Sequence, residues 1–205
     1  MKTIKHIEFL NITLKLNNFF NDLYSNKLIF KEYLRRIEQL SQEYNKYGFI
    51  DKNHMIGDIF EIFIEGFIHI IGTYPTIGIT DYIPVKKSED NGVDGVGIGL
   101  NNLPLTVQVK YRNNPLHELT SDDIKQFGYQ SFRLYDVDVK TKTNMVIFTT
   151  ASDLHWHTKN EVFDNGMRVI NRNDISNIID NNGCFWKDMI TLINDTKIIL
   201  FGENK

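Results

Sequence analysis

The order of apolar patterns along the chain constrains the fold most, because strand-like runs alternate with helical ones. A helix is expected from about Met55 to Ile71, where apolar residues recur at the spacing of one helical face. Strand-like runs lie at Ile77–Val85, Gly92–Leu100, Leu103–Arg112, Met145–Thr150 and Met167–Ile170, with helices expected around residues 120–135 and 157–165 and two more at the end. This order predicts an α/β fold in which a mixed central sheet is flanked by helices.

The first 50 residues follow a different pattern. Residues from Ile4 to Tyr47 read as helical, with turn signals at Asn17-Asn18 and Ser25-Asn26. We expect residues 1–50 to form a helical region that serves in recognition or dimerisation, or that packs on one face of the sheet. Residues 51–205 are expected to form the main domain.

The composition is that of a globular protein, with 41% hydrophobic and 24% charged residues. The net charge of −3 gives no basic field over the whole protein, so any surface for nucleic acid must be a local patch. The single cysteine, Cys184, rules out an intramolecular disulfide and is expected in the core beside Phe185-Trp186. Neither a signal peptide nor a membrane-spanning segment is predicted, so we expect a soluble, cytoplasmic protein.

One acidic residue stands out in the strand pattern. Asp94 lies between two valines, although acidic residues are depleted in strand interiors. Asn101-Asn102 predicts a hairpin turn between the two strands around it, which brings Asp94 toward Gln108 and Lys110. Strand alternation places Gln108 and Lys110 on one face together with Thr106 and Arg112. The alternative is that this polar row is simply a solvent-exposed face of the sheet.

These side chains suit a particular chemistry. A carboxylate and an amide oxygen are ligands that Mg²⁺ prefers. A lysine beside such an ion can position or help deprotonate an attacking water and neutralise a phosphate oxygen. Metal-assisted hydrolysis of a phosphodiester is the reaction that these groups would serve.

Asp94 followed by Gln108-Val109-Lys110 resembles the PD-(D/E)xK nuclease motif in its QxK form, and more narrowly the catalytic domain of Mrr-type restriction endonucleases. The resemblance extends over about residues 55–182 in six collinear blocks. These blocks are Gly57-Asp-Ile-Phe-Glu61 with Gly72, Gly92-Val-Asp94-Gly, Val107-Gln-Val-Lys-Tyr-Arg112, Ile124-Lys-Gln-Phe-Gly128, Val146-Ile-Phe-Thr-Thr-Ala151, and Met167-Arg-Val-Ile170 with Asn173-Asp-Ile-Ser. It implies a restriction-endonuclease-like fold.

The resemblance also implies roles for individual residues. Asp94 would bind a divalent cation, Mg²⁺ with Mn²⁺ able to substitute, and Gln108 and the backbone carbonyl of Val109 would be further ligands. Lys110 would be the catalytic lysine. Glu61 would orient the attacking water or act as an outer ligand of the metal, with Glu65 as the alternative carboxylate on the same helix. A solvated helix stripe of Asp58, Glu61, Glu65 and His69 is the competing interpretation of these acids.

The resemblance implies a metal-dependent endonuclease that cleaves double-stranded DNA in restriction or phage (antiviral) defence. We expect a homodimer, because two chains with one site each cut both strands most simply. Three alternatives remain at this point: a homing or junction-resolving endonuclease of the same fold, a DNA-binding protein that no longer cleaves, and a subunit of a larger defence complex. Arg112 with Lys125, and Lys86-Lys87, are expected to contact phosphates or to be solvated surface.

Overall fold

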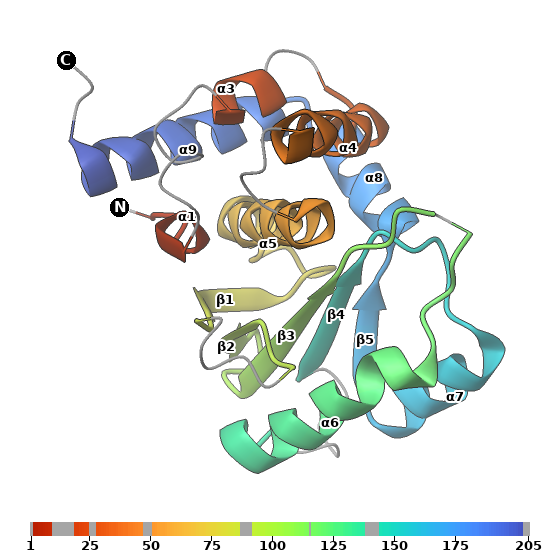
Figure 1. Cartoon of the computed structure of the whole chain (residues 1–205). Coiled ribbons are helices and arrows are strands. Elements are labelled where there is room, and N and C mark those ends of the chain that lie inside the picture. The colour runs from red at the N-terminus through yellow and green to blue at the C-terminus, as the bar shows by residue number, and fades with distance from the viewer. Residues whose placement is uncertain are drawn as a thin grey trace. The chain divides into compact units, whose positions relative to one another are not determined.

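The computed structural model describes residues 2–9, 19–24, 28–46, 51–86, 92–114, 116–137 and 144–202 (Figure 1). The chain divides into two compact units. One contains the residues up to Ile70 together with those from Ile175 onward, and the other contains Ile71–Asp174. We call them the helical unit and the sheet unit.

The helical unit is built around an aromatic core. Its helices are α1 (His6–Phe9), α3 (Phe19–Leu23), α4 (Phe30–Lys46), α5 (Lys52–Ile71), α8 (Arg172–Asp180) and α9 (Phe185–Phe201), of which α5 and α8 run into the sheet unit at one end. The ring of Phe63 on α5 stacks on Tyr33 of α4 at a centroid distance of 4.6 Å and meets Phe185 of α9 edge-on. Such aromatic pairs add to the stabilisation from burial alone, and they join helices from both ends of the sequence.

The sheet unit contains one five-stranded mixed sheet (Figure 1). The strands β1 (Ile79–Pro84), β2 (Gly95–Gly99), β3 (Pro104–Lys110), β4 (Met145–Thr149) and β5 (Met167–Ile170) lie in this order across the sheet. The first three pair antiparallel, while β3, β4 and β5 pair parallel. The helices α6 (Ser121–Tyr135) and α7 (Trp156–Asp164) connect the parallel strands. The prediction of an α/β fold with a mixed central sheet and flanking helices is confirmed.

The turn between β2 and β3 sets the register that the site depends on. Asn102 has a φ of 59°, a conformation that asparagine tolerates better than most residues. The tight turn pairs Gly97 with Leu105 and Gly95 with Val107. The hairpin predicted at Asn101-Asn102 is therefore present, and the strand that carries Asp94 lies beside the strand that carries Gln108.

Two expectations about burial are wrong. The polar row on β3 is not an exposed face, because Thr106 is fully buried and donates a hydrogen bond to the hydroxyl of Ser131 on α6 at 2.7 Å. β3 is a central strand covered by α6, so its polar residues need partners inside the protein. Cys184 is exposed rather than in the core, because it immediately precedes α9 and its neighbours Phe185 and Trp186 turn inward instead.

The compact units divide the chain after Ile70 and after Asp174, and the domain boundary expected near residue 50 stays a prediction. Most of α8 and all of α9 belong with the N-terminal helices. Trp186 of α9 packs against Tyr33 of α4 at a centroid distance of 5.3 Å. The role of residues 1–50 in recognition or dimerisation stays a prediction. Among the helices that the structure describes, none is long and apolar enough to cross a membrane.

Candidate functional site

Asp94 lies just before β2, where the regular pairing with β3 ends. Its backbone N–H donates to the carbonyl of Val107 at 3.0 Å. Its carboxylate Oδ2 accepts a hydrogen bond of 2.6 Å from the backbone N–H of Val109. The carboxylate therefore takes the place that a strand carbonyl would have in the ladder. Because the N–H and C=O of one strand residue point to the same side, the carbonyl of Val109 is directed toward Asp94 as well.

Gln108 lies one residue before Val109 and is 2% exposed. Its amide Nε2 donates to the backbone carbonyl of Gly92 at 2.9 Å. Gly92 has a φ of 93°, a conformation in which a residue with a side chain is strained. Its other amide atom, Oε1, is buried and has no hydrogen-bond partner among the described residues. An unpaired buried oxygen costs about 1–3 kcal/mol, so this atom calls for a partner beyond the described residues, such as a water or a bound ligand.

Lys110 ends β3, two residues after Gln108 on the same face of the strand. Its backbone is firmly held, because its carbonyl accepts hydrogen bonds from the Thr149 hydroxyl at 2.9 Å and from the Thr150 N–H at 3.2 Å. Its side chain is half-buried. Within the part of the chain that the structure describes, no carboxylate forms an ion pair with its ammonium group. Asp94 is thus hydrogen-bonded to the backbone of Val109, which lies between Gln108 and Lys110 near the end of β3. The grouping of these side chains around one ion stays a prediction.

Two other basic residues near this end of β3 are already paired. The guanidinium of Arg112 forms an ion pair and a hydrogen bond with Asp123 on α6. Lys125 pairs with Asp122 at 2.9 Å. The charges expected to contact phosphate at these positions are thus partly compensated within the chain, while Lys87 lies outside the described residues. Lys86 is exposed, and Lys110 forms no ion pair with a described carboxylate.

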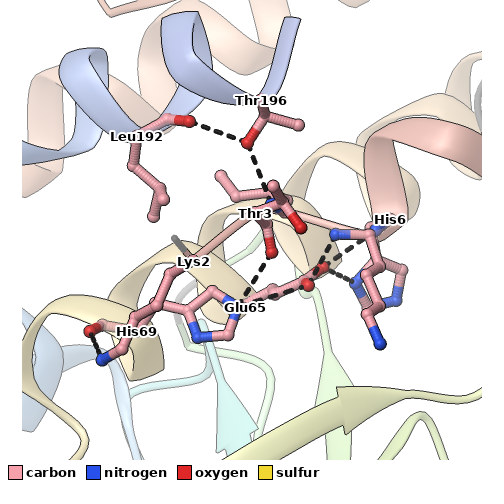
Figure 2. A network of polar contacts seen from close by, with 9 residues as sticks. Lys2, Thr3, His6, Glu65, His69, Leu192 and Thr196 are labelled. Carbon is pink, nitrogen blue, oxygen red and sulfur yellow. Dashed lines mark hydrogen bonds and ion pairs between the residues drawn. The ribbon is translucent and has the colours of Figure 1, made fainter. Parts of the chain in front are cut away.

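The two glutamates predicted from the helix, Glu61 and Glu65, lie on α5 in the helical unit. Glu65 is fully buried and Glu61 is 19% exposed, so the interpretation of a solvated helix stripe is wrong. Both oxygens of Glu65 are engaged by the backbone and ring of His6 and by the N–H of Lys5 (Figure 2). Glu65 is thereby committed to holding the N-terminus, which leaves Glu61 as the more accessible carboxylate. The participation of Glu61 at the Asp94 site stays a prediction.

Charge is concentrated around these two glutamates. Burial alone lowers the pKa of His6, but hydrogen bonds and charge from Glu61 and Glu65 outweigh it and raise this pKa from 6.5 to about 9. Burial alone raises the pKa of Glu65, but the hydrogen bonds of His6 and His69 and the charge of His6 lower it to about 2. His6 is therefore an imidazolium and Glu65 a carboxylate at neutral pH.

The residues around Asp94 fit a hard divalent cation. One carboxylate, one unpaired amide oxygen and one backbone carbonyl supply oxygen donors of the type that Mg²⁺ and Mn²⁺ take, with water filling the remaining positions. Among the described residues, no three histidine, cysteine, aspartate or glutamate side chains form a group that could hold a metal ion. A metal at this site would therefore rest on a single side-chain carboxylate, Asp94.

Sequence reasoning missed the part played by Gly92. Its backbone carbonyl uses the amide donor of Gln108 and so fixes which end of that amide is left unpaired. The residue belongs to the Gly92-Val-Asp94-Gly block, but a carbonyl has no signature in a sequence. α7 begins at Trp156, close to the helix start expected at about residue 157.

Comparison with solved structures gives a distant likeness. No protein-family model matches the chain, and no curated protein sequence matches it. Among solved structures, the chain is similar to the MspJI restriction endonuclease in complex with a 27-mer oligonucleotide, with 13% sequence identity and a TM-score of 0.42. The match covers 82% of this chain and 35% of the endonuclease, so the chain spans about a third of that protein's length. A likeness this distant does not establish a shared activity.

Proposed function

We propose that the protein is a divalent-metal-dependent endonuclease that hydrolyses phosphodiester bonds in double-stranded DNA. The observation that carries this proposal is the geometry at the end of β3. The carboxylate of Asp94 accepts a hydrogen bond from the N–H of Val109, the residue that follows Gln108. Among the described residues, the buried amide oxygen of Gln108 has no hydrogen-bond partner, and the ammonium of Lys110, two positions later, has no ion-pair partner. Such an arrangement would present a negative, a neutral and a positive polar group to one substrate.

Each residue has a distinct part in the proposed reaction. Asp94, the Oε1 atom of Gln108 and the Val109 carbonyl would hold the cation, which supplies electrostatic stabilisation of the phosphate and activation of water. The ammonium of Lys110 would hold the attacking water or neutralise charge that develops on a phosphate oxygen. The hydrogen bond from Val109 to Asp94 fixes the carboxylate before substrate arrives, which lowers the cost of reorganisation.

The glutamine at position 108 has a physical explanation within this proposal. A glutamate there would have no N–H to donate to the carbonyl of Gly92, whereas the amide does so and still presents an oxygen to the site. The expected consequence is a cation held more weakly than by two carboxylates. Cleavage should therefore need millimolar rather than micromolar Mg²⁺, with Mn²⁺ active at lower concentration.

The proposal extends to the biological setting and the assembly. Restriction or antiviral defence, and a homodimer with one site per chain, follow from the resemblance to Mrr-type enzymes and from the need to cut two strands. A homing or junction-resolving endonuclease would use the same site. A DNA-binding protein without cleavage is disfavoured because Asp94 and Lys110 are both present. Asp94 directly precedes β2 and Lys110 ends β3, so the pairing of these two strands fixes the backbone near both residues.

Incubation with supercoiled plasmid and Mg²⁺ or Mn²⁺ tests the proposal. We expect cleavage by the wild type and a loss of about 100- to 10,000-fold in Lys110→Ala, the range typical for removing a group that takes part in proton transfer. Lys159→Ala is the matched control, because this lysine pairs with Asp153 at the surface. Retained DNA binding without cleavage in the wild type would favour a binding protein, and equal cleavage by wild type and Lys110→Ala would refute the site.

A further inference from the structure

Arg112 lies two residues beyond the end of β3, and its backbone is held there by the hydroxyl of Thr150. Its N–H donates to this hydroxyl at 2.6 Å, and the hydroxyl donates to its carbonyl at 3.0 Å. Thr150 is fully buried, and its own N–H donates to the carbonyl of Lys110 at 3.2 Å. The pairing of β3 with β4 thus continues past the last strand residue, and strand alternation places Arg112 on the same face as Lys110.

The guanidinium of Arg112 is fixed by the first turn of α6. One of its terminal nitrogens forms an ion pair with Oδ1 of Asp123, and the other donates to the carbonyl of Tyr111 at 3.0 Å. The second carboxylate oxygen, Oδ2, accepts hydrogen bonds from the backbone N–H and the hydroxyl of Thr120 at 3.0 and 3.1 Å. Because both oxygens of Asp123 are bound, this carboxylate is a fixed anchor for the arginine.

The same helix brings Arg112 beside one of the proposed metal ligands. Gln126 lies one turn after Asp123 on α6, so the two side chains are neighbours on the helix surface. The side chain of Gln126 lies against Gly92, where an added Cβ would come within 3.1 Å of its Cγ. Gly92 is also the residue whose carbonyl accepts the hydrogen bond from Gln108. Arg112 and Gln108 therefore contact or approach neighbouring turns of α6, within the sheet unit.

The ion pair with Asp123 does not use all the donors of the guanidinium. An arginine carries five N–H groups in a planar fork and stays protonated in proteins. Contacts with described residues use two of these N–H groups, and the side chain of Arg112 is 27% exposed. The fork matches the geometry of a phosphate. A carboxylate that already orients the side chain lowers the entropy cost of binding one.

We propose that Arg112, held by Asp123, binds a phosphate of the DNA backbone next to the one that is cleaved. The inference rests on the proposed function, in which the end of β3 binds DNA. Two residues of extended chain separate Arg112 from Lys110, a span of about 6.6 Å, which is comparable to the separation of successive phosphates on one strand. Such a contact positions the duplex without reading its sequence.

The salt dependence of DNA binding by the full-length protein tests the inference. Fluorescence anisotropy with a labelled duplex oligonucleotide, with Ca²⁺ in place of Mg²⁺, gives the slope of the logarithm of the binding constant against that of the salt concentration. We expect Arg112→Gln to reduce the magnitude of this slope by about 1, equally for duplexes of different sequence. In plasmid cleavage with Mg²⁺, the same variant should raise KM more than it lowers kcat.

Two variants provide matched controls, and thermal melting of each reports on folding. Asp123→Asn breaks the same ion pair but keeps the cation, so the slope should stay that of the wild type even if Tm falls. Arg133→Ala removes an equal charge from the last turn of α6, where the arginine lies over the ring of Tyr129. It should also leave the slope unchanged.

The outcomes separate failure of the inference from failure of the proposed function. An unchanged slope in Arg112→Gln, or an equal reduction in Asp123→Asn or Arg133→Ala, overturns the inference. Cleavage that is lost in Lys110→Ala would still leave the nuclease proposal standing. A wild type that binds DNA with the expected effect of Arg112→Gln, but cleaves none with Mg²⁺ or Mn²⁺, supports the phosphate contact and overturns the nuclease proposal. A wild type that binds no DNA overturns both.

A spectroscopic measurement keeps the inference testable if Arg112→Gln does not fold. The side-chain N–H signals of arginine in the wild type are followed by NMR while the duplex is added. We expect the Nε–H signal of Arg112 to shift in proportion to the DNA bound, whereas that of Arg133 stays in place. A signal of Arg112 that does not respond to saturating DNA would show that its guanidinium binds no phosphate.

Discussion

The two polar clusters of this protein differ in how completely their buried groups are paired. In the helical unit, each oxygen of Glu65 has partners, two of them backbone N–H groups. In the sheet unit, the buried oxygen of Gln108 has no partner among the described residues, and no carboxylate described there pairs with Lys110. A saturated network specifies a unique structure, whereas an unsatisfied one costs stability and calls for a ligand. The comparison separates an anchor from a candidate active site.

The largest expected effect is on cleavage activity and tests the role of the cluster in the sheet unit. Asp94→Asn keeps the shape of the side chain, and its carbonyl oxygen can still accept the hydrogen bond from Val109, but it removes the only carboxylate among the proposed ligands. We expect a loss of cleavage of at least about 1,000-fold, since a bound metal contributes several kcal/mol and each 1.36 kcal/mol is a factor of ten. The Tm should stay close to that of the wild type.

Plasmid cleavage and thermal melting check this prediction together. Activity of Asp94→Asn within tenfold of the wild type would mean that the carboxylate charge is not used. A large fall in Tm would instead mean that Asp94 is an anchor like Glu65, and the distinction between the two clusters would fail.

The next largest effect is on the free energy of unfolding and tests the role of Glu65 in the helical unit. Glu65→Gln leaves the imidazolium of His6 buried beside a neutral amide, and breaking a buried pair in this way costs about 3–5 kcal/mol. Chemical denaturation monitored by circular dichroism measures this loss. Glu43→Gln on the exposed face of α4 is the control and should change the free energy of unfolding by less than about 0.5 kcal/mol. Similar values for the two variants would contradict the role of Glu65 as an anchor.

A smaller effect is expected on the Mg²⁺ dependence of cleavage when Gln108 is changed. Gln108→Glu adds a second carboxylate to the site but removes the N–H that the Gly92 carbonyl accepts from. We expect the Mg²⁺ concentration for half-maximal cleavage to fall by about tenfold, equivalent to 1.4 kcal/mol of added binding. The metal-free protein should melt a few degrees lower, because a buried carbonyl loses its donor. An unchanged Mg²⁺ dependence would exclude position 108 from the metal site.

The smallest expected effect is the pH dependence of stability. The folded-state pKa of His6 is raised to about 9, so the stability it contributes is complete below pH 6.5 and is lost as the pH rises toward 9. The folded-state pKa of Glu65 is lowered to about 2, so its contribution is complete above about pH 4.5 and is lost as the pH falls toward 2. We expect the wild-type Tm to fall by a few degrees between pH 6.5 and 9.

Melting curves across this pH range check the prediction, with His6→Gln as the control. The variant has no imidazole to titrate, so its Tm should vary less over the same range. Parallel curves for wild type and His6→Gln would show that the pH dependence arises elsewhere in the molecule.

The order of elements was readable from the sequence because it depends on local periodicity. The apolar face of α5, the turn at Asn101-Asn102 and the alternation along β3 each leave a pattern within a few residues. The approach of Asp94 to Gln108 followed from the same hairpin. Local patterns were thus sufficient for the sheet and for the position of Asp94 next to β3.

The remainder depends on contacts between distant residues. His6 and Glu65 are separated by 59 residues, and neither lies in a pattern that pairs it with the other. The burial of Glu65 could not be distinguished from a solvated helix stripe, because the stripe has the same spacing whether water or the N-terminus covers it. Cys184 was misplaced for a related reason, since apolar neighbours in the sequence do not fix which way a residue between two helices points.

Diffraction from crystals soaked in Mn²⁺, with anomalous data collected near the manganese edge, tests the central claim most directly. We predict one anomalous peak within coordination distance of an Asp94 oxygen, Gln108 Oε1 and the Val109 carbonyl, and its absence in crystals of Asp94→Asn. Crystals that bind no Mn²⁺ at this position, with Gln108 Oε1 hydrogen-bonded to another part of the chain, would contradict the claim that the unpaired groups at the end of β3 form a metal-dependent active site.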